Sequence, residues 1–455
     1  MAPLAILLAE RGHAVTGSDT ALYPPMSKLL ARAGIPVAAG FAAENVPPEC
    51  DCVVIGNAVP RDNPEVLEVV RRGLPYISMP QAIERYLLPG KQSVVVAGTH
   101  GKTTTSALLA WLLLDSGRDP GFLIGGEMKN LGRGFRDGAG PVFLLEGDEY
   151  NTAFFDRGPK FLHYRPRMLL LNNIEFDHAD LYPDLESLVT VFTRLARLVP
   201  ADGAIVANTA DPAVARAIGG APGRFIPVGL DSAQGYAAGS IAVDSAGTRF
   251  DLLRNGQPLG RFLSPLYGRH NLQNAMMALA AALDLGLSPQ EAAAALPRFA
   301  GVKRRLEVLA ESNGVTYVDD FAHHPTAVRE TLAAARLRWP GRRLWAVFEP
   351  RSITAGRKFF EREYRKALSL SDVAVIAPVF HSGRFDAREL IDRDSIAASL
   401  ASEGKLAHVP DRVGDIGEIL ARDAMPGDVV VLMSSGDFGG LRQRLDSSSR
   451  PNIQS

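Results

Sequence analysis

The stretch Ser93-Val-Val-Val-Ala-Gly98-Thr-His-Gly101-Lys102-Thr-Thr-Thr105 carries the strongest structural signal in this sequence. An apolar run of strand length enters a glycine loop, and we expect a helix over Ser106–Asp115 to follow it. Backbone N–H groups of such a loop converge on phosphate oxygens at the helix N-terminus. The pattern therefore predicts a phosphate-binding loop. A strand–turn–helix junction with an exposed lysine is the simpler alternative.

Each polar residue of the loop has an expected task. Lys102 would reach the β- and γ-phosphates of a nucleotide, and the Thr103 hydroxyl would bind Mg²⁺. The usual motif has one more glycine, where this chain has Val96, so the loop is a shortened variant. The residues expected to bind the nucleotide here are Gly98, Thr99, His100, Gly101, Lys102, Thr103 and Thr104.

Similar apolar runs alternate with helical periodicity on both sides of the loop. They are rich in Val, Ile and Leu and end at Gly, Pro or polar residues, which is typical of strands buried on both faces of a parallel sheet. We therefore predict an α/β fold. The runs are Cys52–Ile55, Ser93–Ala97, Val142–Leu145, Met168–Leu171, Leu344–Phe348, Val373–Ala377 and Val429–Met433.

The 455 residues correspond to about three domains at roughly 150 residues each. We predict a Rossmann-like N-terminal domain over 1–90, a central P-loop ATPase-like domain with a parallel sheet over 91–302, and a C-terminal Rossmann-like domain over 303–455. Segment Ser232–Pro265 alternates and contains glycine turns, so we expect a small antiparallel patch on the central domain. A helix over Asn271–Leu287 would close that domain.

Charge and cysteine content exclude several classes of protein. Lys and Arg number 49 and Asp and Glu number 50, a net charge of −1, so no global basic field attracts nucleic acid or an anionic membrane. No apolar run approaches the ~20 residues that span a bilayer. The only cysteines, Cys50 and Cys52, are poorly spaced for a disulfide. We therefore expect a reduced, cytoplasmic protein without nucleic-acid or membrane partners.

Carboxylates and a histidine follow two of the apolar runs. In an open α/β sheet, ligands bind at the carboxyl ends of strands, so Glu146 is suited to hold the magnesium that bridges nucleotide phosphates. A solvated acidic turn is the alternative. Asp177-His178 follows the next run. We expect His178 to bind a second magnesium ion or transfer a proton, whereas a lone histidine is more often structural.

Two further segments are candidates for nucleotide binding. Asn271 and Asn274 share one helix face, and their amides can read the edge of adenine; capping is the alternative for Asn271. The run Val302-Lys-Arg-Arg305-Leu-Glu307 is open to two interpretations. It is either solvated linker charge or the source of an arginine for the phosphates.

These motifs together resemble the Mur ligases, ATP-dependent enzymes that form amide bonds in peptidoglycan synthesis. The resemblance implies three domains and assigns Glu146 and His178 to metal ions. It also assigns Asn271 and Asn274 to ATP and brings Arg305 to the phosphates. It is carried by Gly98–Thr104, Glu146–Phe155, Lys160–Arg167, Tyr267–Asn274 and Asn172–Asp180.

Within the family, the stretch Tyr164-Arg-Pro-Arg167 resembles the branch that joins UDP-N-acetylmuramate to the tripeptide L-alanyl-γ-D-glutamyl-meso-diaminopimelate in peptidoglycan recycling. The branch that adds L-alanine is the alternative. The resemblance implies ATP as co-substrate, Mg²⁺ as cofactor, an acyl-phosphate intermediate, and Lys102 and His178 as catalytic residues. We expect a monomer or weak homodimer. A nucleotide switch or nucleic-acid motor would need a basic groove or a guanine-reading motif, which the sequence lacks.

The substrate residues are expected in the outer domains. The resemblance places Asp320, His324 and Arg351 in the acceptor cleft. Arg351 suits a substrate carboxylate through its planar fork, whereas Asp320 and His324 would orient the amine or bridge to ATP. Two Asp and two His over 319–324 suggest a metal site, but adjacent histidines cannot easily point at one ion and no second cluster lies nearby in sequence. Family members bind the UDP group with the N-terminal domain, so the resemblance implies that Ser18, Asp19 and Asn57 contact it.

The N-terminal domain departs from the family pattern. Relatives begin with one more strand and a glycine-rich loop, whereas Pro3–Glu10 reads as the helix after that loop. We therefore expect weak UDP-sugar binding for a chain that begins at Met1, and micromolar binding by calorimetry would refute this.

Overall fold

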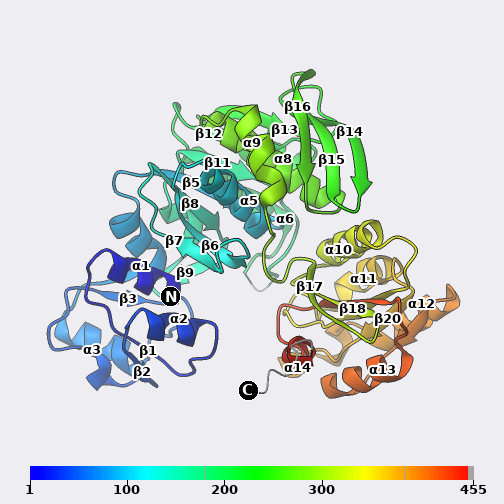
Figure 1. The fold of residues 1–455 in the computed structure, drawn as a ribbon. Coiled ribbons are helices and arrows are strands. Elements are labelled where there is room, and N and C mark those ends of the chain that lie inside the picture. The colour runs from blue at the N-terminus through cyan, green and yellow to red at the C-terminus, as the bar shows by residue number, and fades with distance from the viewer. Residues whose placement is uncertain (180, 385, 449–455) are drawn as a thin grey trace, which may run out of the picture.

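The computed structural model describes residues 1–179, 181–384 and 386–448. It has three α/β lobes, as the sequence predicts (Figure 1). The N-terminal lobe, in blue, and the C-terminal lobe, in yellow to red, lie below the central lobe on opposite sides. None of the helices in the described part of the chain is long and apolar enough to cross a membrane.

The N-terminal lobe holds two separate pairs of parallel strands, β1–β2 and β3–β4. The elements are α1 (Ala2–Glu10), β1 (Gly17–Asp19), α2 (Met26–Arg32), β2 (Val37–Ala39), β3 (Val53–Ile55), α3 (Pro64–Arg72), β4 (Tyr76–Ser78) and α4 (Met79–Ala82).

The central lobe is built on a ten-stranded sheet of order β16-β15-β14-β13-β12-β11-β5-β8-β6-β7. The strands are β5 (Gln92–Ala97), β6 (Gly121–Met128), β7 (Arg133–Arg136), β8 (Val142–Gly147), β11 (Met168–Leu171), β12 (Ala204–Asn208), β13 (Arg224–Val228), β14 (Tyr236–Asp244), β15 (Gly247–Arg254) and β16 (Gln257–Ser264). Neighbouring strands pair in parallel along the sheet from β14 through β13, β12, β11, β5 and β8 to β6, and β7 pairs antiparallel with β6. Strands β14, β15 and β16 form the predicted antiparallel patch.

Strand β5 shows why this sheet is buried on both faces. Val94 and Val96 belong to the core cluster beneath α5 and α8, and Val95 and Ala97 belong to the cluster on the opposite face, because successive side chains of a strand point to opposite sides. The remaining elements of this lobe are α5 (Lys102–Asp115), a hairpin of β9 (Asn151–Ala153) and β10 (Asp156–Pro159), α6 (Leu185–Arg197), α7 (Pro212–Ile218), α8 (Arg269–Asp284) and α9 (Pro289–Ala295).

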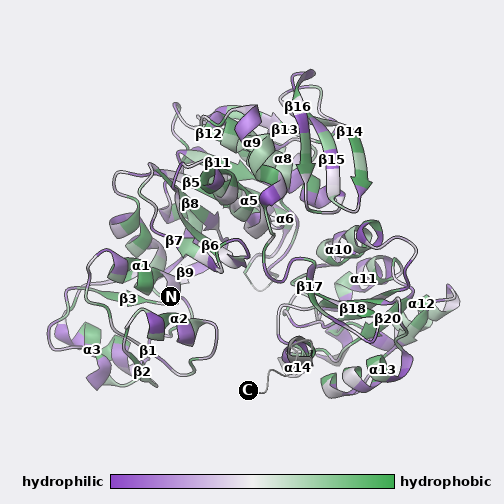
Figure 2. Ribbon diagram, in the orientation of Figure 1, coloured by the Kyte–Doolittle hydropathy of each residue, from purple (hydrophilic) through white to green (hydrophobic). Residues whose placement is uncertain are grey.

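The C-terminal lobe has a six-stranded sheet of order β17-β18-β22-β19-β20-β21, parallel except for edge strand β17. Its strand β20 is green, and therefore apolar, in Figure 2. Its elements are β17 (Glu307–Ser312), β18 (Val315–Asp320), α10 (Pro325–Arg338), β19 (Leu344–Phe348), α11 (Glu361–Leu368), β20 (Val373–Ile376), α12 (Arg393–Ser402), β21 (Leu406–His408), α13 (Ile416–Asp423), β22 (Val429–Met433) and α14 (Leu441–Ser448).

Two of the predicted helices have different bounds in the structure. Helix α5 begins at Lys102, four residues before the predicted start, because the helix continues directly into the loop. Helix α8 covers Arg269–Asp284 and not Asn271–Leu287.

Candidate functional site

A cavity of about 2070 Å³ lies where the three lobes meet. Met1 and Met79 line it from the N-terminal lobe, Lys102 from the central lobe, and Arg305 and Phe321 from the C-terminal lobe. Its floor is the loop between β5 and α5, at the carboxyl ends of the parallel strands. Such a position is the usual ligand site of an α/β sheet.

The two glycines of this loop have no room for a side chain. Gly98 has φ +127°, and a Cβ there would lie 2.8 Å from the carbonyl oxygen of Asn173. Gly101 has φ +80°, and its Cβ would lie 2.3 Å from Oδ1 of Asn274. Glycine is therefore required by the packing of the loop against two neighbouring segments as well as by its backbone conformation.

Lys102 is paired with a carboxylate. Its Nζ lies 2.7 Å from the carbonyl oxygen of Gly98 and 2.9 Å from Glu149 Oε2. Burial alone lowers the pKa of Lys102, but Glu149 and the nearby Asp148 outweigh it and raise the pKa. Lys102 is therefore charged at neutral pH.

Glu149 also contacts His178. The Nε2 of His178 lies 3.0 Å from Glu149 Oε1, and its Nδ1 lies 2.7 Å from the hydroxyl of Tyr150. Burial lowers the pKa of His178, but its hydrogen bond to Glu149 and the charge of Asp177 raise it overall. His178 also has φ +55°, a strained conformation for a residue other than glycine. Glu149 thus contacts both Lys102, the expected phosphate-binding residue, and His178, the expected metal-binding residue.

Thr103 and Glu146 lie side by side on the cavity wall. The Thr103 hydroxyl donates to Glu146 Oε1 at 2.9 Å, and Glu146 Oε2 accepts from the backbone N–H of Gly125 at 2.7 Å. A hydroxyl and a carboxylate form the all-oxygen donor set that Mg²⁺ prefers. The predicted magnesium-binding pair is therefore brought together, and it fits the ion chemically.

Asn274 supports the loop. Its Oδ1 accepts from the Thr105 hydroxyl at 3.3 Å, and its Nδ2 donates to Asn271 Oδ1 at 3.3 Å, so the two asparagines share one helix face as predicted. Capping does not explain Asn271, because the N-cap of α8 is Gly268. The Asn271 amide donates to the carbonyl oxygen of Tyr267 instead. Thr104, Asn271 and Asn274 all line the cavity.

Most of the residues predicted to bind substrates in the outer lobes do not line the cavity. Ser18 donates to Glu65 at 2.6 Å, Asp19 accepts from the N–H of Ala21, and Asn57 is exposed. None of these three is among the described residues that line the cavity. Asp19 nevertheless acts on the amino group of Met1: desolvation and the charge of Lys160 lower the pKa of this group overall, and the charge of Asp19 partly offsets them.

In the C-terminal lobe, Asp320 accepts from the N–H groups of Leu306 and Ala322, at 2.7 and 2.8 Å. The Asp320 carboxylate therefore fixes the backbone at Leu306, near the start of this lobe, to the end of β18. The Arg351 guanidinium lies 3.8 Å from the ring centre of Phe380 and 3.5 Å from Glu349, beside the cavity-lining Ser352.

Arg305 and His324 lie at the border of the central lobe. Arg305 lines the cavity above the Phe321 ring, whereas the neighbouring Arg304 donates to the carbonyl oxygen of Ser434 at 2.6 Å. His324 caps α10 and lies 3.7 Å from Glu175.

Four site residues received no role from sequence reasoning: Glu149, Asn172, Asn173 and Glu175. Asn172 donates to the Thr105 hydroxyl at 3.0 Å, and Asn173 Oδ1 accepts from the His100 N–H at 2.7 Å. The available signal was their position just after β8 and β11, the strands on either side of β5.

Comparison with known proteins agrees with this architecture. Residues 1–88 match the model of the Mur ligase family catalytic domain, 96–282 that of the Mur ligase middle domain, and 304–436 that of the glutamate ligase domain. The chain belongs to the Mur ligase family. As a Mur ligase it is a ligase of peptidoglycan synthesis, as its resemblance implies.

Two similar relatives are named UDP-N-acetylmuramate–L-alanyl-γ-D-glutamyl-meso-2,6-diaminoheptandioate ligase. The one from Escherichia coli is 39% identical over 98% of this chain and 95% of its own length. The one from Haemophilus influenzae is 37% identical over 98% and 96%. A UDP-N-acetylmuramate–L-alanine ligase from Desulfitobacterium hafniense is 34% identical over 98% and 96%.

Solved Mur ligases share the fold. The murein peptide ligase of Psychrobacter arcticus covers the whole chain and 97% of its own, with a TM-score of 0.73 and 34% identity. The UDP-N-acetylmuramate–alanine ligase of Thermotoga maritima covers 98% of this chain and 96% of its own, with a TM-score of 0.80 and 24% identity.

Proposed function

We propose that this Mur ligase uses ATP to join UDP-N-acetylmuramate to L-alanyl-γ-D-glutamyl-meso-diaminopimelate. The observation that carries the proposal is the cavity shared by all three lobes, with Lys102 and the Thr103–Glu146 pair on its floor. It offers room for a nucleotide, a sugar nucleotide and a peptide at once. The two relatives named for this tripeptide, at 39% and 37% identity, support the choice of acceptor.

The triphosphate binds along the loop Gly98–Thr104, where backbone N–H groups and the N-terminus of α5 favour anions. Lys102 leaves Glu149 for the β- and γ-phosphates, and Arg305 approaches them from the C-terminal lobe. Thr103 and Glu146 would hold Mg²⁺, and His178 a second ion. The metal supplies charge neutralisation for the phosphoryl oxygens. Asn271 and Asn274 read the adenine edge.

The reaction then follows from charge and proximity. The lactyl carboxylate of UDP-N-acetylmuramate attacks the γ-phosphorus, ADP leaves, and an acyl phosphate forms. Lys102 stabilises the charge that spreads over the transferred oxygens. The free amine of the tripeptide attacks the activated carbonyl, loses a proton, and phosphate departs with one former carboxylate oxygen. The surrounding lobes exclude water, which would otherwise hydrolyse the intermediate.

Arg351, Asp320 and His324 bind the acceptor, with the Arg351 fork facing a peptide carboxylate. Ser18, Asp19 and Asn57 contact the UDP group in the N-terminal lobe. The second candidate is ligation of L-alanine. It is favoured by the relatives named for that reaction, which are nearly as similar to this chain.

One assay separates the two candidates. Purified protein is given ATP, Mg²⁺ and UDP-N-acetylmuramate with either the tripeptide or L-alanine, and phosphate release and product mass are measured. We expect the tripeptide to give the higher kcat/KM. A higher value for L-alanine would overturn the choice of acceptor, and no product with either would overturn ligation.

Two further measurements address the mechanism. UDP-N-acetylmuramate labelled with ¹⁸O in its carboxylate should transfer one label to the released phosphate. Unlabelled phosphate would exclude the acyl phosphate. Lys102→Ala should abolish ATP-dependent ligation, and retained turnover would exclude the assignment of the loop.

A further inference from the structure

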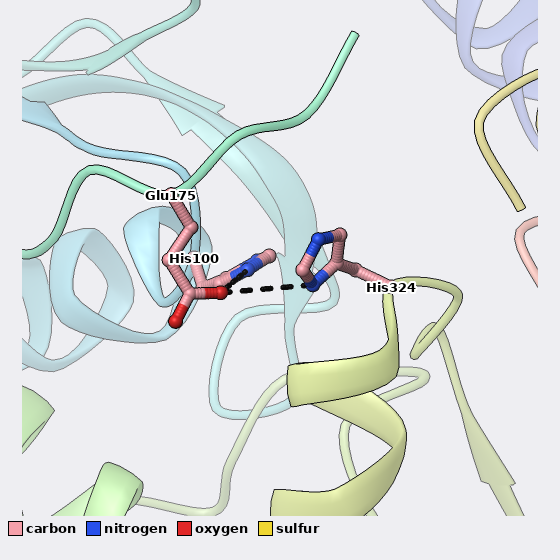
Figure 3. Close-up of side chains that lie close together, drawn as sticks. All are labelled: His100, Glu175 and His324. Atoms are coloured by element: carbon pink, nitrogen blue, oxygen red, sulfur yellow. Dashed lines mark hydrogen bonds and ion pairs between the residues drawn. The ribbon is translucent and has the colours of Figure 1, made fainter. Parts of the chain in front are cut away.

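Three side chains with metal-binding atoms meet at the border between the central and C-terminal lobes (Figure 3). His100 comes from the loop before α5, Glu175 from the segment after β11, and His324 from the N-cap of α10. Nε2 of His100 lies 3.1 Å from Glu175 Oε2, and Nδ1 of His324 lies 3.7 Å from the same oxygen. All three ligand atoms lie within 4.8 Å of one another.

These separations suit one small ion. Ligand atoms at about 2.0–2.1 Å from a tetrahedral zinc ion are roughly 3.3 Å apart. Two of the contacts already have nearly this spacing, and the two imidazole rings, whose centres are 4.7 Å apart, face each other across the gap. The three ligand atoms are therefore close enough to share one ion.

The charge state of the cluster also suits a metal. Burial, and then the neighbouring His100, lower the pKa of His324 to about 4, so this ring is neutral at pH 7. Burial alone raises the pKa of Glu175, but its hydrogen bond to His100 outweighs this and brings the pKa to about 2. A neutral imidazole and an ionised carboxylate are the forms that bind metal ions.

The His324 ring is held with Nδ1 as the acceptor. Its Nε2 lies 3.3 Å from the carbonyl oxygen of Phe176, and the N–H of Thr326 donates to its Nδ1 at 3.3 Å. The ring proton therefore resides on Nε2, and a metal ion bound at Nδ1 would replace the hydrogen bond from the Thr326 N–H. Metal-binding histidines typically give their other N–H to a backbone carbonyl or carboxylate in this way.

We propose that His100, Glu175 and His324 form a binding site for a divalent transition-metal ion of the zinc class, which would fasten the nucleotide loop to the C-terminal lobe. Two imidazoles favour such an ion over Mg²⁺, which prefers oxygen. His100 and Glu175 also line the cavity, so a fourth coordination position faces solvent. The site is distinct from the all-oxygen pair Thr103–Glu146.

The test uses metal-free full-length protein and Co²⁺, without nucleotide or substrate. Four-coordinate Co²⁺ absorbs visible light far more strongly than six-coordinate Co²⁺. We expect one equivalent to give the intense spectrum, excess Zn²⁺ to abolish it and excess Mg²⁺ to leave it unchanged. His324→Gln and Glu175→Gln should each weaken Co²⁺ binding roughly a hundredfold or more, which exceeds the usual effect of losing an outer-sphere partner.

His323→Gln is the matched control. His323 is adjacent and half-buried, but its Nδ1 faces the carbonyl oxygen of Phe321, so this variant should keep the spectrum. Absence of the intense spectrum in the unmodified protein, or its retention in His324→Gln, would overturn the proposal. If His324→Gln fails to fold by circular dichroism, Glu175→Gln decides, because its side chain is 39% exposed. The readout does not depend on ligase activity, so it is independent of the proposed function.

Discussion

Replacement of Glu149 by glutamine tests the network under the nucleotide loop. The Glu149 side chain is 1% exposed and contacts both Lys102 and His178. Glutamine keeps the shape but removes the charge, so the Lys102 ammonium keeps the backbone carbonyls of Gly98 and Thr99 but loses its ion-pair partner. We therefore expect Glu149→Gln to lower the free energy of unfolding of the central lobe.

The size of the loss follows from the pKa. Burial alone raises the pKa of Glu149, but the charges of Lys102 and His178 lower it from 4.5 to about 2. At about 1.4 kcal/mol per pKa unit this corresponds to about 3 kcal/mol. Breaking a buried ion pair costs roughly 3–5 kcal/mol, so both approaches agree in magnitude.

The contribution of Glu149 to the free energy of unfolding should decrease as the pH falls. Because the folded-state pKa of Glu149 lies below its unfolded value, its contribution is present above about pH 4.5 and is lost as the pH falls toward 2. The difference in stability between the unmodified protein and Glu149→Gln should therefore shrink across this window. An ATP analogue should also reduce the difference, because phosphate then becomes the partner of Lys102.

Scanning calorimetry at pH 7 is the assay. For a domain of roughly 200 residues, 3 kcal/mol lowers Tm by about 6–12 °C. Glu186→Gln in the same lobe is the control, since that side chain is 68% exposed and should change stability by less than about 0.5 kcal/mol. A loss below about 1 kcal/mol for Glu149→Gln would refute the reasoning.

Three further substitutions have defined outcomes. Gly101→Ala places a Cβ against Asn274 at φ +80°; we expect it to cost about 1–3 kcal/mol and weaken ATP-analogue binding by calorimetry, and unchanged binding would contradict this. Thr103→Val should raise the Mg²⁺ concentration for half-maximal turnover at least about tenfold, with Thr103→Ser restoring it. Arg351→Lys should raise KM for the tripeptide about tenfold while KM for ATP stays constant; equal changes in both would exclude an acceptor role.

The strand pattern and the nucleotide loop were predictable because both depend on local sequence. Each apolar run became a strand, and the alternation in Ser232–Pro265 became the antiparallel patch. The helix start at Lys102 was predicted too late, because propensity does not show how far a helix continues into a loop. The domain boundaries at 90/91 and 302/303 and the roles of the site residues remain predictions.

The chemistry of single segments could therefore be predicted from the sequence, because a glycine loop or an acidic strand end is defined by a few consecutive residues. Which segments meet was decided by the tertiary structure. Sequence reasoning discounted a metal site at His324 because no second cluster lies nearby in the chain, yet folding brings His100 and Glu175 to it from another lobe. In the same way, only the packing of parallel strands puts Glu149 between Lys102 and His178. Contacts between residues distant in sequence depend on how lobes and sheets pack, and no local pattern encodes them.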